Sequence, residues 1–63
     1  MKGYIEERAI EIARYIIDNN TTVRQAAKHF GISKSTVHKD ITTRLKKLNA
    51  VLYDRVQEVL YTN

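Results

Sequence analysis

The chain has 63 residues and a formal net charge of +4, from 11 lysines and arginines and 7 aspartates and glutamates. A chain of this length is one small domain, and without cysteine it has neither a disulfide nor a thiolate metal site. It contains no apolar run long enough to cross a bilayer, no signal-peptide pattern, no proline and only two glycines, so we expect a soluble, intracellular, nearly all-helical domain.

The first predicted helix covers about residues 4–18. Apolar residues recur along it at intervals of three and four, the pattern of a helix that buries one face; they are Ile5, Ala9, Ile12 and Ile16. Two glutamates in the first turn, Glu6 and Glu7, suit the positive end of the helix dipole. The helix is expected to end at Asp18.

A tight turn between two short helices is the most informative feature of the chain. Thr22 is placed to cap a helix over residues 23–30, and Gln25 three residues later completes a reciprocal capping box. Gly31 follows where the end of a helix needs a left-handed residue, and Ser33 offers a cap for the next helix. Two helices joined by so short a turn cross steeply, as in a helix-turn-helix.

The apolar residues around this turn indicate how its two helices pack. Ile32 before the second cap and Val37 after it have the spacing of a hydrophobic staple, which sets the angle of entry into the next helix. Ala27 lies at the predicted crossing point, where a larger side chain would push the helices apart. The first of the two helices is expected to bury Ala26, Ala27 and Phe30. We place the helix-turn-helix at about residues 22–43.

Two further helical stretches complete the predicted fold. The third predicted helix runs from Lys34 to about Leu48, with one apolar face made of Val37, Ile41, Leu45 and Leu48. Asn49 is a predicted cap for the last helix, whose apolar face holds Leu52, Val56, Val59 and Leu60. We expect the first and last helices to cover the core on the side away from nucleic acid. The predicted fold is an all-α, four-helix single domain over residues 1–63.

The positive charge is concentrated in the same part of the chain. Residues 22–48 hold seven lysines and arginines against Asp40 alone, a net charge of +6, while the remaining residues carry −2. A basic segment in a slightly acidic chain is the electrostatic pattern of a protein that binds phosphate backbones. The alternative is a solvated surface that happens to be basic. Together with the turn, the pattern favours nucleic-acid binding.

Side chains on the second helix of the turn are the candidates for reading DNA bases. With Val37 and Ile41 inward, five residues face outward or sideways, where a major groove can receive them: Lys34, Ser35, His38, Lys39 and Thr42. Lys39 is the best candidate for a donor to guanine acceptors, and His38 and Ser35 can contact bases directly or through water.

A second set of residues is expected to contact phosphates. At the start of a helix the free backbone amides and the positive end of the dipole favour an anion. The candidates are Thr22, Arg24, Gln25, Lys28, Ser33, Arg44 and Lys46. The cations among them have an alternative role on the solvated surface. Arg44 can pair with Asp40 four residues earlier, and Lys46 can suit the dipole of the last helical turn.

No catalytic or metal site is predicted. His29, which we expect to be exposed, and His38 are far apart and lack further ligands. Ser35, His38 and Asp40 are the residue types of a catalytic triad, but Asp40 points to a different side of the helix from Ser35. We expect no enzymatic activity and no cofactor. The tyrosines are expected to pack at the margin of the core; they are Tyr4, Tyr15, Tyr53 and Tyr61.

The run GISKSTVHKDITTRL, with the helix YIEERAIEIARYII ahead of it, resembles the stage III sporulation protein D family. The likeness extends over nearly the whole chain, and residues 33–40 are its most specific part. Members of this family are small transcription regulators of endospore-forming bacteria. The resemblance implies sequence-specific DNA binding in the mother cell, activation of some sporulation genes, repression of others, and a recognition helix from Lys34 to about Thr43.

The resemblance also raises an expectation about the C-terminus. Members of the family look longer and continue past the last helix into a second basic segment that is thought to touch DNA beside the main site. This chain stops at Asn63 without such a segment, so we expect a lower affinity. The members are thought to bind as monomers, with the second contact replacing the second half-site of a dimer. Dimerisation through an exposed face of the last helix is the alternative.

The leading hypothesis is a transcription regulator of endospore formation that binds double-stranded DNA, with RNA polymerase as a further candidate partner and no membrane partner. We expect it in the cytoplasm, associated with the nucleoid. One alternative is a helical protein-interaction module, which would show an exposed apolar patch on the last helix through Leu52, Tyr53 and Leu60. Another is the DNA-targeting subdomain of a recombinase or transposase.

Overall fold

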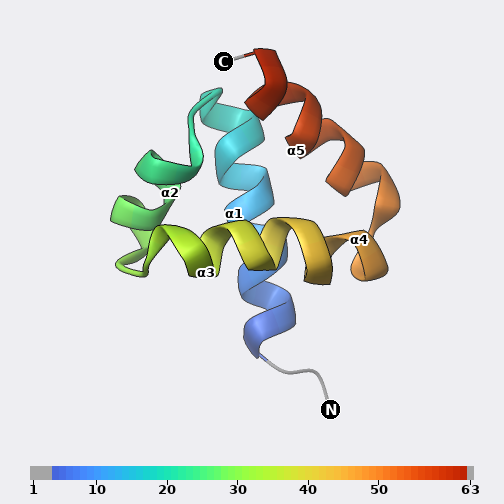
Figure 1. The fold of residues 1–63 in the computed structure, drawn as a ribbon. Helices are drawn as coiled ribbons and strands as arrows, with labels where there is room; N and C mark the ends of the chain where they lie inside the picture. The colour runs from blue at the N-terminus through green and yellow to red at the C-terminus, as the bar shows by residue number, and fades with distance from the viewer. Residues whose placement is uncertain (1–3, 63) are drawn as a thin grey trace.

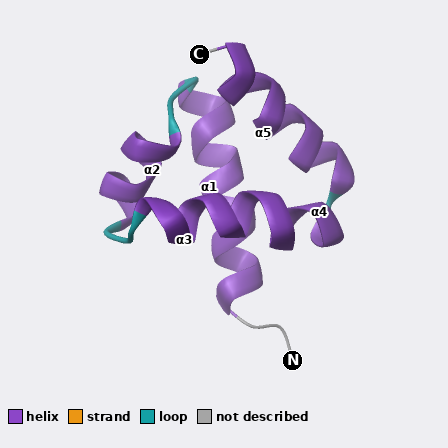
Figure 2. Ribbon diagram, in the orientation of Figure 1, coloured by secondary structure: helices purple, strands orange, loops and turns teal. Residues whose placement is uncertain are grey.

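The computed structural model describes residues 4–62 as helices joined by short turns. In chain order these are α1 (Tyr4–Asn19), α2 (Val23–Phe30), α3 (Lys34–Lys39), the π-helical turn η1 (Asp40–Arg44), α4 (Leu45–Leu48) and α5 (Ala50–Thr62). Because α3, η1 and α4 follow one another without a break, we call them together the rod. The described residues contain no strand (Figure 2), and the predicted all-α fold is confirmed. None of the helices over residues 4–62 has the length and apolar character of a transmembrane span.

The rod crosses in front of α1, while α2 and α5 lie on either side of the C-terminal half of α1 (Figure 1). α1 packs against α2, η1, α4 and α5 and is therefore the element that the others share. The predicted apolar stripe of α1 is buried except at Ile5, which is half-buried. The largest fully buried apolar side chains are Ile12, Ile16, Val37, Ile41, Leu45 and Val56.

The turn between α2 and α3 has the predicted geometry. Thr22 Oγ1 accepts a hydrogen bond from the Gln25 N–H at 3.2 Å, which is the forward half of the capping box. Gly31 adopts the left-handed conformation with φ 69°, and the Ile32 N–H donates to the Ala27 carbonyl at 3.0 Å. These bonds close the end of α2 in the manner of a Schellman motif. The predicted cap at Ser33 is also confirmed, because its Oγ accepts from a backbone N–H of α3 at 3.2 Å.

The rod contains a π-helical turn that the sequence pattern did not predict. At the end of this turn the Leu45 N–H donates to the carbonyl of Asp40, five residues earlier. In an α-helix the acceptor would be four residues earlier. Val37, Ile41 and Leu45 are nevertheless all fully buried. In a regular α-helix a span of eight residues rotates the side-chain direction by about 80° beyond two full turns. The wider turn reduces this rotation and keeps the three side chains on one face.

Two side chains expected in the core are less buried than predicted, and both lie at the end of a helix. Leu48 is 37% exposed because it is the last residue of α4, and the chain leaves the rod at Asn49. Phe30, the last residue of α2, is half-buried and meets the ring of Tyr15 edge-on with 5.7 Å between centroids.

The tyrosines divide into two pairs. Tyr15 and Tyr53 are half-buried and pack against the core, as expected. Tyr4 and Tyr61 are 72% and 93% exposed, so the expectation of core packing is wrong for them. Both lie in a terminal turn of their helix, where no neighbouring element covers the side chain.

The last helix begins as the sequence predicts. Asn49 Oδ1 accepts a hydrogen bond from the Leu52 N–H at 3.1 Å and caps α5. Val56 is fully buried, and the other three predicted apolar residues are half-buried and pack against the core: Leu52, Val59 and Leu60. α5 thus completes the core on the side of α1 opposite α2 (Figure 1).

Replacement of Gly31 tests the contribution of the left-handed turn to stability. A Cβ at this position meets no atom within 4 Å, so the penalty for alanine comes from the backbone alone. We expect Gly31→Ala to lower the free energy of unfolding by about 1 kcal/mol, measured by urea denaturation. Gly31→Asn should lower it less, because asparagine adopts the left-handed conformation more readily. Equal losses for both variants would contradict this explanation.

Candidate nucleic-acid interface

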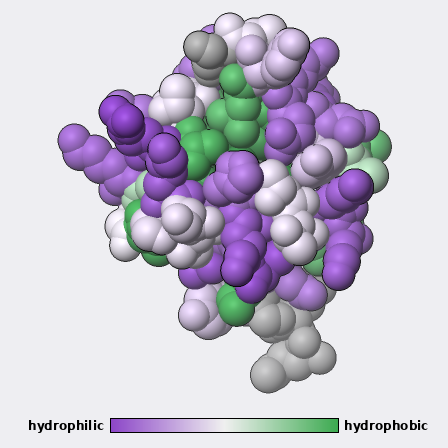
Figure 3. All heavy atoms as spheres, viewed as in Figure 1, coloured by the Kyte–Doolittle hydropathy of each residue, from purple (hydrophilic) through white to green (hydrophobic). Residues whose placement is uncertain are grey.

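The outward side of α3 holds four of the five predicted base-reading residues as exposed side chains: Lys34, Ser35, His38 and Lys39. We call these four the α3 outer face. The Ser33 cap starts the helix just before them, and the fully buried Val37 anchors its opposite side in the core. Polar side chains dominate the rod and α2 in the space-filling view (Figure 3). The α3 outer face is therefore a polar surface with two ammonium groups and an imidazole.

Three predicted site hydroxyls are already engaged within the protein: Thr22, whose Oγ1 caps α2, and Thr42 and Ser33. Thr42 is half-buried, and its Oγ1 donates to the His38 carbonyl at 2.6 Å. A hydroxyl has one hydrogen to donate, so Thr42 can offer a ligand only its lone pairs and its methyl group. Ser33 Oγ accepts from the Thr36 N–H and also lies 2.8 Å from Thr36 Oγ1. Its first role is to cap α3.

The start of α2 lies beside the α3 outer face. Four predicted phosphate-contacting residues at or on α2 are exposed: Thr22, Arg24, Gln25 and Lys28. Val23, from the same turn, lines a shallow hollow together with all four residues of the α3 outer face. The structure therefore brings the start of α2 and the outward side of α3 onto one surface.

Arg44 and Lys46 lie away from the start of α2, although Arg44 lines a separate hollow with Ser35 and Lys39 of the α3 outer face. Arg44 and Lys46 belong to η1 and α4, and Figure 1 places α4 at the opposite end of the rod from α2. Arg44 Nη1 binds Asp40 Oδ1 at 2.9 Å, so the ion pair that the sequence left open is present. The Lys46 ammonium lies 5.9 Å from the centroid of the Tyr53 ring. Neither cation joins the group around the start of α2.

Asp40 supports the α3 outer face in a way that the sequence revealed only in part. Its side chain is fully buried, and its two oxygens bind two arginines from different elements. Arg8 Nε on α1 lies 2.8 Å from Oδ2, and Arg44 supplies the second contact. Asp40 therefore ties α1 to the rod directly after the α3 outer face. The sequence indicated the pair with Arg44, four residues away, but gave no sign of the contact with Arg8, which is 32 positions away.

The other side chains considered for catalysis or metal binding make contacts within the fold. His29 is exposed, as expected, and its ring stacks on Tyr15 with 4.2 Å between centroids and 13° between planes. The Asp40 carboxylate, held by two arginines, does not face His38 or Ser35 as a triad would require. Within residues 4–62 there is no group of three His, Cys, Asp or Glu side chains that could hold a metal ion.

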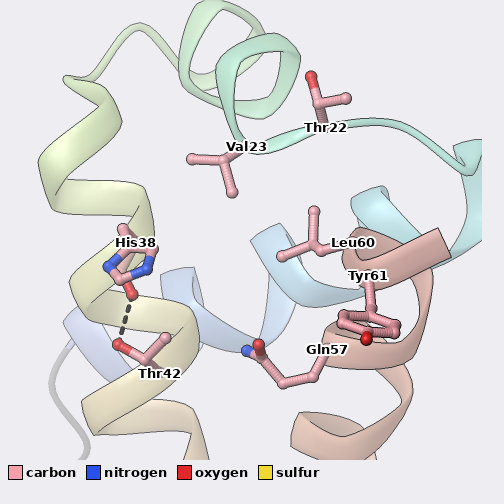
Figure 4. Close-up of a pocket in the computed structure, with 7 residues that line it drawn as sticks. All are labelled: Thr22, Val23, His38, Thr42, Gln57, Leu60 and Tyr61. Carbon is pink, nitrogen blue, oxygen red and sulfur yellow. Dashed lines mark hydrogen bonds between the residues drawn. The ribbon is translucent and has the colours of Figure 1, made fainter. Parts of the chain in front are cut away.

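A second hollow of about 400 Å³ opens next to the first (Figure 4). It lies between the start of α2, the rod and the end of α5, and its lining residues are Thr22, Val23, His38, Thr42, Gln57, Leu60 and Tyr61. In the space-filling view an apolar area appears here, above the rod and between α2 and α5 (Figure 3). We expected the last helix to lie away from the predicted DNA surface. The structure instead places the end of α5 beside Thr22 and His38.

A family model described as stage III sporulation protein D matches residues 2–63 of the chain. The chain belongs to this family. The resemblance seen in the sequence is thereby confirmed, and the helices and hollows described above are those of a member of a sporulation protein family.

One relative shows how far this similarity reaches. The stage III sporulation protein D of Bacillus subtilis (strain 168) is 53% identical over 60 residues, which are 95% of this chain and 64% of that protein. The chain therefore spans just under two thirds of the length of this relative. No solved structure matches the chain.

Removal of the charge on Asp40 should destabilise the fold. Asparagine has nearly the same shape but leaves two guanidinium groups without their anion. Breaking a fully buried pair costs about 3–5 kcal/mol, and because Arg8 and Arg44 are 23% and 39% exposed we expect Asp40→Asn to lose about 2–3 kcal/mol. Urea unfolding measures this. Arg44→Met should cost less, because Arg8 still binds the carboxylate; a larger loss for Arg44→Met than for Asp40→Asn would refute the central role of Asp40.

Proposed function

We propose that the chain binds double-stranded DNA in a sequence-specific manner and regulates transcription during endospore formation. The observation that carries this proposal is the α3 outer face, an exposed polar surface beside the start of α2. It lies within the segment of the chain that has a net charge of +6. A basic helix presented in this way after a tight glycine turn matches the geometry by which helix-turn-helix proteins enter the major groove.

In the proposed mechanism α3 lies in the major groove. The Lys39 ammonium donates to the N7 and O6 acceptors of guanine, and His38 and Ser35 contact neighbouring base edges directly or through water. Lys34, at the start of α3, contacts a base or a phosphate. Each base contact selects one base pair, and together they determine the operator sequence.

The start of α2 supplies the proposed phosphate contacts. Thr22, Arg24 and Gln25 are exposed around the first turn of α2, where free backbone N–H groups and the helix dipole favour a phosphate. Lys28 extends the positive surface one turn further along the helix. These contacts position α3 in the groove and provide most of the affinity, without selecting a sequence.

Family membership supports the biological part of the proposal. The B. subtilis relative is by its name a sporulation protein. We extend this role to the present chain as a DNA-binding activator and repressor of mother-cell genes. It would act as a monomer in the cytoplasm, at the nucleoid, with RNA polymerase as a further partner at activated promoters.

The alternative functions receive less support. A protein-interaction module was expected to expose an apolar patch through Leu52, Tyr53 and Leu60, yet all three side chains are half-buried and pack against the core. The DNA-targeting part of a recombinase or transposase would share the helix-turn-helix, but the family that matches the chain is named for sporulation.

Selection of duplexes from a random pool, repeated at two salt concentrations, tests the proposed function. We expect one enriched site without two-fold symmetry, as a monomer requires. The logarithm of the binding constant should fall steeply with the logarithm of salt concentration, since each neutralised phosphate contributes about −0.9 to the slope. Absence of any enriched sequence, or binding that is insensitive to salt, would overturn the proposal.

Lys39→Ala tests direct reading of a base. Loss of a base contact should weaken binding to the selected site by about 1–3 kcal/mol and relax the preference at one base pair. Fluorescence anisotropy with the selected duplex and its single-base variants measures both effects. An equal loss on every duplex would reassign Lys39 to a phosphate contact.

Arg24→Gln tests the phosphate contacts at the start of α2. We expect weaker binding of about the same factor on all duplexes, and a salt slope reduced by about 1. Arg14→Gln is the matched control, because Arg14 is also an exposed arginine but belongs to α1 and lines a different hollow with Asp18 and Arg55. If both variants lose affinity to the same extent, the effect reflects net charge and not a contact at α2.

A further inference from the structure

The proposed mechanism gives no role to the end of α5, which forms one side of the second hollow. This hollow shares Val23, His38 and Thr42 with the hollow at the α3 outer face, so the two are continuous. In the close-up Val23 and Leu60 point toward each other from opposite sides, with His38 and Thr42 on the rod and Tyr61 on α5 (Figure 4). A ligand on the α3 outer face that extends past Thr42 would therefore meet α5.

Tyr61 is the side chain of this hollow that the fold itself does not use. It is 93% exposed, and among residues 4–62 its hydroxyl has no hydrogen-bond partner. The preceding residue, Leu60, packs against the core and makes the apolar contact between the end of α5 and the rest of the domain. The phenol group is thus a free donor at the edge of the hollow.

The position of Tyr61 relative to the rod is set by contacts one turn earlier. Gln57 Nε2 donates to the Ile41 carbonyl in η1 at 3.4 Å, and Val56 beside it is fully buried. Since Tyr61 follows Gln57 by four residues, it lies on the same side of α5. These contacts hold the Tyr61 backbone at a defined place beside the rod.

The chemistry of the hollow suits a sugar–phosphate strand. No acidic residue lines either hollow, and Lys34 and Lys39 contribute two positive charges to the adjoining one. The apolar walls match the C–H surface of deoxyribose, and the Tyr61 hydroxyl can donate to a phosphate oxygen.

We infer that this hollow binds the backbone of the DNA strand that borders the major groove. Tyr61 donates a hydrogen bond to a phosphate oxygen, and Leu60 contacts the adjacent deoxyribose. The inference rests on the proposed DNA binding and adds the end of α5 to that interface. Because phosphates are the same at every base pair, the contact selects no sequence but fixes the position of α3 in the groove.

Tyr61→Phe, which removes only the hydroxyl, tests the contact. The whole chain is titrated with the selected duplex and with an unrelated duplex, and we expect affinity for both to fall by a similar factor of roughly three to ten. Tyr4→Phe is the matched control, because Tyr4 is also exposed but lies at the start of α1. Tyr61→Ala should weaken binding at least as much as Tyr61→Phe while leaving urea unfolding unchanged.

Ethylation of individual phosphates gives a second readout. Ethylation at one or two positions beside the selected site should weaken binding by the wild-type chain but not by Tyr61→Phe. If Tyr61→Phe binds like Tyr4→Phe while the wild type binds DNA, the inference is wrong and the proposed function stands. If the wild type binds no duplex, the proposed function fails and the inference fails with it.

Discussion

Asp40 binds two arginines from different elements, and both of its carboxylate oxygens are used. A fully buried carboxylate is tolerated only when partners replace its hydration, so Arg8 and Arg44 must both remain close to it. The contact lies where α3 passes into η1, directly after Lys39. It therefore sets the position of the rod against α1. This one buried anion thereby fixes where the end of the α3 outer face lies relative to α1.

The exposed surface depends on this constraint together with the turn before it. Gly31 and the Ser33 cap determine where α3 begins, Val37 fixes which side is buried, and Asp40 fixes where the end of α3 lies. With both ends held, Lys34 and Lys39 stay on one outward side, and neither side chain bonds to another residue within 4–62. A rigid support of this kind leaves the cations free for a ligand and limits the conformational entropy lost on binding.

Local signals predicted most of the fold and the centre of the candidate site. Capping residues, the left-handed glycine and the apolar spacing act within a few positions, so Thr22, Gly31 and Ser33 could be assigned their roles from the printed sequence. Once Val37 and Ile41 were assigned to the core, helical geometry predicted which residues of α3 are exposed. The same reasoning was least reliable at helix ends, where Leu48 and Tyr61 are more exposed than their helical pattern indicated.

The sequence by itself therefore determined the helices, the turn and the basic outward side of α3, because these depend on neighbours three or four residues apart. Two features depend on the tertiary structure alone. One is the Arg8–Asp40 ion pair, which joins residues 32 positions apart, and the other is the position of the end of α5 beside Thr22 and His38. The tertiary structure also decided that η1 is π-helical. Contacts between distant segments depend on how whole helices pack against one another, and a helical repeat in the sequence carries no information about that arrangement.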